Sequence, residues 1–175
     1  AFKNCSELEE IIWGSNVENI GNCAFEACKK LKQIEFPAKL TGIGSHAFYN
    51  CTGLTKLEIP DSVNAIYGRA FYNCTNLSEI NYPMSLSNAG EEIFANTKLT
   101  RMTVPEGVTK LADRVFKNCT NFIKIQLPAT LKSISNSSLE GCTGLTELEL
   151  PEGLTSIGNW GMYNCTGLTE LELPE

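Results

Sequence analysis

Apolar and polar side chains alternate in a short stretch, residues 54–59, that recurs along the whole chain. Leu57 and Ile59 are separated by Glu58, which is the pattern of a short strand with one buried face. Pro60 follows, and because proline cannot donate a hydrogen bond to a neighbouring strand, the strand is expected to end there. Each repeat is therefore predicted to contribute one short β-strand.

The second half of the same unit contains a different apolar spacing. Val63 and Ile66 lie three residues apart and are expected to point back toward the strand. Ala70 and Phe71 then predict a single helical or 3₁₀ turn, in which the small alanine allows close approach and the phenylalanine fills the core. Asn73 ends the unit, since asparagine tolerates the left-handed conformation that terminates helices.

The unit repeats at a nearly constant interval. CTGLTKLEIP at position 51 returns as CTGLTELELP at 142 and 165, and the unit starts fall at 5, 28, 51, 74, 97, 119, 142 and 165. A period of 23 with one step of 22 is typical of a solenoid. We therefore predict one α/β array over residues 1–175, with about eight coils that each bury roughly seven apolar side chains against their neighbours. Strands would line the concave face of a right-handed superhelix and helical or 3₁₀ turns its convex face.

The fifth unit and the two chain ends depart from the pattern. Ala89 replaces the usual isoleucine, Thr97 replaces the cysteine, and one residue is missing before Leu99. These changes predict a local irregularity in the stack at 86–99. The chain opens inside one unit and stops just after the strand of another, without the polar caps that solenoids need. We therefore expect an uncapped segment of a longer protein.

Seven of the eight cysteines occupy one position of the repeat, so they should stack in a column: Cys5, Cys28, Cys51, Cys74, Cys119, Cys142 and Cys165. We interpret the column as buried free thiols that behave as small hydrophobes. A disulfide between adjacent coils stays open as an alternative, because neighbouring coils lie within reach. A linear column does not converge on a tetrahedral zinc site, so no metal is expected. Cys23 lies at a variable position that is expected to be exposed.

The charge distribution limits the partners. The net charge of −6 disfavours nucleic acid, and the absence of an apolar run long enough to span a bilayer predicts no membrane insertion. Residues 98–132 carry seven basic and two acidic side chains, whereas residues 133–175 carry seven acidic and none basic. Either the charges drift among solvated positions, or a basic patch interrupts an acidic surface.

The pattern C-T-x-L-T-x-L-x-L-P-x-x-L-T-x-I-G-x-x-A-F resembles the BspA-like class of leucine-rich repeats, and the resemblance covers all eight units. It implies a bacterial secreted or cell-surface protein and a role in adhesion, with a host or microbial surface protein or glycan as partner. The residues themselves indicate only a solenoid, which we expect to be monomeric.

No constellation of catalytic residues is apparent. His46 is the only histidine, which removes the Ser-His-Asp and Cys-His arrangements. Paired carboxylates such as Glu147 and Glu149 come from the repetition and share one environment, whereas acid–base catalysis needs two different ones. We expect neither an enzyme nor a cofactor.

A binding site is instead expected on the outward positions of the strands. The middle strands carry a mixed polar strip there: Lys56, Glu58, Glu79, Asn81, Arg101, Thr103, Lys124 and Gln126. Such a strip suits contacts with a protein or a glycan. The alternatives are a solvated sheet without a partner and a structural spacer that displays another domain. Tyr49, Tyr72 and Tyr163 are expected on the opposite side, either as simple packing or as a second contact stripe.

Overall fold

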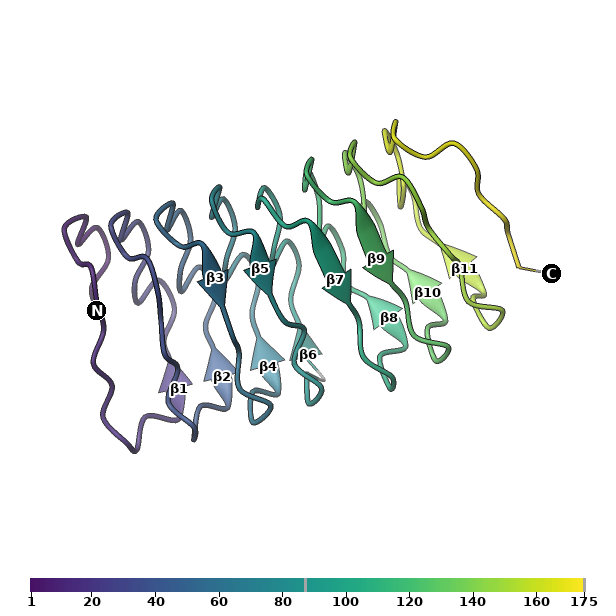
Figure 1. Ribbon diagram of the computed structural model, residues 1–175. Helices are drawn as coiled ribbons and strands as arrows, with labels where there is room; N and C mark the ends of the chain where they lie inside the picture. The colour runs from purple at the N-terminus through teal and green to yellow at the C-terminus, as the bar shows by residue number, and fades with distance from the viewer. Residues whose placement is uncertain (87, 175) are drawn as a thin grey trace.

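A computed structural model describes residues 1–86 and 88–174 of the chain. The coils stack one after another, with the two chain ends at opposite ends of the stack (Figure 1). All regular elements in the described residues are short parallel strands. They form two ladders on different sides of the stack, and the core lies between them.

The rear ladder carries one two-residue strand from each of seven coils. Four strands pair in the order β1 (Asn19–Ile20), β2 (Gly42–Ile43), β4 (Ala65–Ile66) and β6 (Asn88–Ala89). Three more pair in the order β11 (Ser156–Ile157), β10 (Ser133–Ile134) and β8 (Lys110–Leu111).

The front ladder is built from the Leu-x-Leu stretches of the repeat. Its strands are β3 (Lys56–Leu57), which pairs with β5 (Glu79–Ile80), and β7 (Arg101–Thr103), which pairs with β9 (Lys124–Gln126). Isolated bridges join Glu35 to Glu58 and Lys124 to Glu147, which extends the ladder by one coil in each direction. The predicted parallel strands are thus confirmed, while the curvature and hand of the stack stay predictions.

The expected helical or 3₁₀ turn is wrong: the described residues contain no helix. Its place is taken by a run of turns in each coil, which we call the turn edge: residues 22–27, 45–50, 68–73, 91–96, 113–118, 136–141 and 159–164.

Backbone hydrogen bonds to the next coil explain why no helix forms at the turn edge. The N–H groups of His46, Phe48 and Asn50 donate to carbonyls of the following coil at 2.8 to 3.1 Å. Only the alternate residues, Ala47 and Tyr49, donate to carbonyls three positions back. His46 and Asn50 also have positive φ angles of 58° and 59°, which interrupt helical geometry. The left-handed asparagine is thus confirmed, and stacking supplies the bonds that a helix would have made internally.

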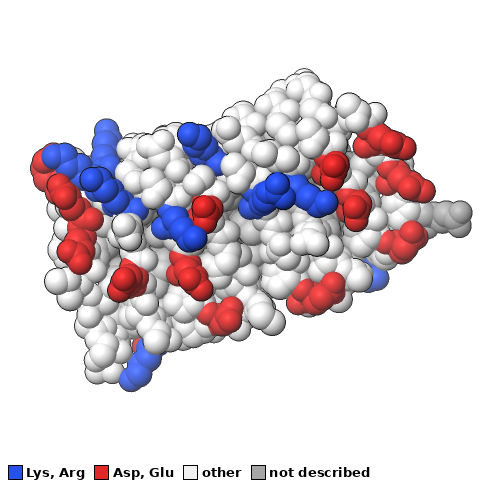
Figure 2. Space-filling view, viewed as in Figure 1, with Lys and Arg blue, Asp and Glu red and all other residues white. Residues whose placement is uncertain are grey.

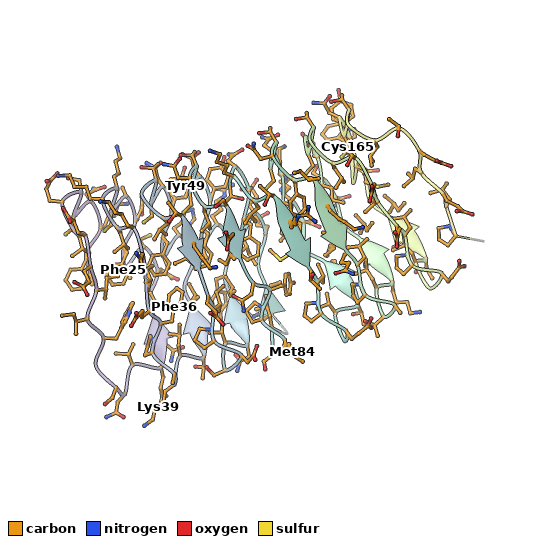
Figure 3. The ribbon with its side chains drawn as sticks, viewed as in Figure 1. Phe25, Phe36, Lys39, Tyr49, Met84 and Cys165 are labelled. Carbon is orange, nitrogen blue, oxygen red and sulfur yellow. The ribbon has the colours of Figure 1, made fainter. Side chains whose placement is uncertain are left out.

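Aromatic rings form a continuous column in the core. Phe25, Phe48, Phe71 and Phe94 stack with ring centroids 5.4 to 5.9 Å apart, and the last three are fully buried. Phe116 continues the column 5.8 Å from Phe94. Figure 3 shows Phe25 inside the stack and Tyr49 at the turn edge. Since each ring contacts the coil before and the coil after, no coil completes its own core.

The cysteine column does more than fill space. The thiols of Cys28, Cys51, Cys74, Cys119, Cys142 and Cys165 each donate to a backbone carbonyl of the preceding coil at 3.0 to 3.2 Å. All eight cysteines are free thiols. The expected burial is wrong for Cys5, which is exposed, and for Cys165, which is half-buried, because these two lie in the first and last described coils and are covered from one side only. Thr97 breaks the column, because its hydroxyl donates to the carbonyl of Phe94 in its own coil at 2.8 Å.

Both ladders are interrupted at the shortened step. No pairing joins β5 to β7 or β6 to β8, although all four strands lie in described residues. The turn edge stays continuous there, since Glu92 and Phe94 donate N–H groups to Asp113 and Val115 of the next coil. The irregularity expected at 86–99 is therefore confirmed for the described residues as a break in the ladders, with residue 87 outside them, while the turn edge and the aromatic column pass through it.

Candidate functional site

The eight predicted site residues all lie on the front ladder or directly beside it, and the structure gives them different roles. Lys56 pairs with Glu79 at 2.8 Å, and Lys124 pairs with Glu147 at 3.3 Å. The hydroxyl of Thr103 donates to the side-chain oxygen of Gln126 at 3.1 Å. Many of the side chains on this strip are thus engaged with the neighbouring coil.

Asn81 is the predicted residue least free to contact a ligand. Its side-chain nitrogen donates to the carbonyl of Ile59 at 2.9 Å, and its oxygen accepts from the N–H of Ile59 at 2.7 Å. The amide thereby imitates a ladder partner and extends the pairing of β3 with β5. Asn81 fixes the wall of the site, and Glu58 stands exposed beside it.

A hollow of about 570 Å³ opens on the front face between β5 and β7, where the ladder breaks. Six of the eight predicted residues line it: Lys56, Glu58, Glu79, Asn81, Arg101 and Thr103. Ser78 and Thr100 also line it, and the sequence analysis missed them. The missing residue before Leu99 was the available signal, because it marks where adjacent strands lose their register. Lys124 and Gln126 line a separate hollow of about 240 Å³ between β9 and the following coil, which contributes Glu147 and Glu149.

Arg101 is exposed and has no carboxylate partner among the described residues, unlike the other two cations of β3, β5, β7 and β9. Figure 2 shows Lys and Arg side chains meeting in the middle of this face and Asp and Glu side chains gathered at its C-terminal end. Of the basic residues in 98–132, Arg101 and Lys124 lie on the strands of the front face, whereas Lys110 lies on the rear ladder, so a basic patch on the front face stays a prediction.

The ladder break opens a second hollow of about 480 Å³ on the rear side, between β6 and β8. Tyr82 lines both hollows and is only 5% exposed, so its ring separates them. Burial raises the pKa of Tyr82 to about 12, so its hydroxyl stays protonated at neutral pH.

The turn edge carries an ion-pair cluster that the sequence analysis missed. Glu92 is 9% exposed and lies between Arg69 at 2.5 Å and Arg114 at 3.9 Å, while Arg114 also contacts Glu91 at 3.3 Å. These residues belong to three consecutive coils and hold the stack together across the ladder break. The expected exposure of Cys23 is wrong, because this residue is half-buried where the turn edge packs against the next coil. Glu92 and Ser137, which occupy the same repeat position in two other coils, are buried.

Tyrosines on the turn edge pack mainly against each other. Tyr49 and Tyr72 stack at 5.2 Å, and the guanidinium of Arg69 lies 5.9 Å from the centre of the Tyr72 ring. Tyr163 is exposed beside Trp160, at 6.3 Å. Packing therefore accounts for the first two tyrosines.

The buried thiols are unreactive near neutral pH. Burial raises the pKa of Cys51 to about 12 and that of Cys119 to about 11, so neither forms a thiolate nucleophile near neutral pH. In residues 1–86 and 88–174, no group of three or more His, Cys, Asp or Glu side chains is placed to hold a metal ion. That part of the chain also has no helix long and apolar enough to cross a membrane.

The repeating parallel ladders and the Leu-x-Leu strands define a leucine-rich repeat solenoid. The model of the BspA type leucine rich repeat region matches residues 1–123 and 109–175, with six copies. The chain belongs to this family.

Solved structures show the same architecture. The leucine rich repeat protein of T. pallidum is 31% identical with a TM-score of 0.83, and the match covers 88% of this chain and 72% of that one. A leucine rich cell surface protein of Faecalibacterium prausnitzii is 32% identical with a TM-score of 0.78, over 93% of this chain and 45% of that one. This chain thus spans less than half the length of the second protein. No curated protein matches the chain.

Proposed function

We propose that this chain is a non-catalytic binding module of a secreted or cell-surface protein and that it contacts a protein or glycan partner through its front face, in adhesion or host interaction. The observation that carries the proposal is the front hollow at the ladder break, where an unpaired arginine stands among polar side chains. Concave sites with a few convergent polar groups are the usual places for ligands.

The comparisons support the proposal indirectly. The family consists of repeat proteins that are generally not catalytic, and one similar structure is described as a cell surface protein. The extended surface of a solenoid suits contact with a large partner. Binding of a surface partner, and location outside the cell, are therefore the functions that the fold and its relatives favour.

The test uses charge reversal on one ladder with a matched control on the other. Binding of the wild-type chain to immobilised matrix proteins and glycans is measured at low and high salt, beside the double variant Arg101→Glu, Lys124→Glu. The control is Lys110→Glu, Lys132→Glu, which makes the same charge change at exposed positions of the rear side. Circular dichroism and thermal unfolding show whether each variant is folded.

We expect a partner whose binding weakens with salt, is lost in the front variant and persists in the rear variant, because exposed charges act over about one Debye length. Equal loss in both variants, or binding indifferent to both, refutes contact through the front face.

A structural spacer is the second candidate function. The ion pairs Lys56–Glu79 and Lys124–Glu147 favour it, since they neutralise charges that a ligand would otherwise meet. A spacer binds no partner, so the absence of any ligand for the wild-type chain together with unchanged stability of the front variant supports this candidate.

A further inference from the structure

We propose that the front hollow binds an extended segment of a partner protein that carries one well-placed carboxylate, and that Arg101 anchors this carboxylate. This inference rests on the proposed function, because it names the ligand chemistry of the same face.

The charge arrangement around the hollow directs an acidic group toward β7. On the β5 side, Glu79 is paired with Lys56 at 2.8 Å, so that wall offers no free cation. On the β7 side, Arg101 presents its guanidinium without a carboxylate partner among the described residues. A guanidinium matches a carboxylate through two parallel N–H···O bonds, which is the strongest polar contact that this hollow offers.

The carboxylate of Glu58 stands exposed on the opposite wall. It repels an acidic group that enters at the wrong end of the hollow. The site therefore favours a ligand with a single well-placed carboxylate next to uncharged or basic groups over a uniformly negative polymer.

The backbone at the break favours a peptide over a sugar. β5 and β7 do not form a ladder, although the N–H of Lys98 donates to the carbonyl of Leu77 at 2.9 Å beside them, and an extended chain can bind unpaired strand edges by main-chain hydrogen bonds. Among the described residues that line the hollow, Tyr82 alone is aromatic, and because it is buried it offers a sugar no exposed ring to stack on.

The experiment selects ligands without assuming their sequence. A library of short random peptides is selected on the wild-type chain, and the tightest peptide is then titrated against four proteins by fluorescence anisotropy. These are the wild type, Arg101→Gln, Arg101→Lys and Lys110→Gln; the last removes the same charge from an exposed position on β8 of the rear ladder. Carboxylated oligosaccharides are titrated against the same four proteins.

We expect the selected peptides to share one Asp or Glu flanked by uncharged or basic residues and to bind Arg101→Gln about 10- to 100-fold more weakly than the wild type. Arg101→Lys should restore part of the affinity, because it keeps the charge but loses the two-pronged geometry. Lys110→Gln should leave the affinity unchanged. A version of the peptide with Gln and Asn in place of Glu and Asp should lose as much affinity on the wild type as the arginine variant does.

Three results would overturn the inference: selected peptides without carboxylates, equal affinity for Arg101→Gln, or binding of carboxylated oligosaccharides alone. If binding of a partner is lost in the double variant Arg101→Glu, Lys124→Glu but unchanged in Arg101→Gln, the role of Arg101 as anchor is refuted and the proposed function stands. If neither variant changes binding, both the anchoring role of Arg101 and the proposed contact through the front face are refuted.

Discussion

Raising the pH should destabilise this protein steeply, because its core holds protonated thiols. Burial raises the pKa of Cys51 to about 12 and of Cys119 to about 11, and it raises the pKa values of Cys74 and Cys142 as well. In the unfolded chain these thiols regain a pKa of about 8.5. The unfolded state therefore releases protons that the folded state retains, so stability is complete below about pH 8 and falls as the pH rises above that value.

The size of the effect follows from the number of buried thiols. At pH 9.5 the unfolded state gains about 1.4 kcal/mol for each thiol that ionises only on unfolding. Five cysteines are fully buried, and burial raises the pKa furthest for four of them, Cys51, Cys74, Cys119 and Cys142, which gives a loss of about 6 kcal/mol between pH 7 and pH 9.5. Since natural domains are stable by only about 5–15 kcal/mol, this loss brings the chain close to unfolding.

Urea unfolding under reducing conditions at a series of pH values measures this dependence. The variant Cys51→Thr is the matched control, because threonine already occupies the equivalent position at Thr97 and does not titrate. The free energy of unfolding of this variant should fall less steeply with pH than that of the wild type. The difference in slope is that of one proton, about 1.4 kcal/mol per pH unit above pH 9. Stability that stays constant up to pH 9.5, or an equal slope in the variant, refutes the buried column of thiols.

Three further predictions concern the core, the turn edge and the ladder break. Phe71→Ala removes a fully buried ring from the middle of the aromatic column and should lower the free energy of unfolding by about 3–5 kcal/mol in chemical denaturation. A loss no larger than that of a substitution at an exposed position would contradict the stacked core. Glu92→Gln weakens two arginine contacts and should cost about 1.5–3 kcal/mol, whereas Glu79→Gln in an exposed pair should leave the unfolding midpoint unchanged. One threonine inserted between Thr97 and Lys98 restores the 23-residue step. Amide hydrogen exchange should then slow at the front ladder, and ligand binding at the front hollow should weaken about tenfold or more. Unchanged exchange and unchanged affinity would show that the short step does not create the site.

The fold was largely predictable because the same pattern of apolar and polar residues recurs in each repeat. The spacing of Leu57, Ile59 and Pro60 predicts a short strand, and its repetition predicts a parallel ladder. The turn edge was not predictable in this way. Ala47 and Phe48 fit a helical turn in isolation, but alternate N–H groups are drawn to the next coil, and this competition depends on stacked neighbours.

The candidate site was predictable in position but not in shape. Alternation along the strands placed Arg101 and Thr103 on the outward face, and the missing residue before Leu99 marked the irregular coil. The hollow itself, and the pairing that leaves Arg101 as the free cation, depend on which side chains meet across adjacent coils. Asn81 shows the same limit, since its pattern suggests a ligand contact while its amide bonds to a neighbouring backbone.

The most direct test of binding through the front face is a hydrogen-exchange footprint. Amide exchange is measured by mass spectrometry for the wild-type chain alone and saturated with its tightest ligand. The account predicts that protection on binding concentrates in residues 78–82 and 100–104, around the front hollow, and that the rear strands β8 and β10 are unchanged. Protection confined to the rear ladder or to the turn edge would contradict it.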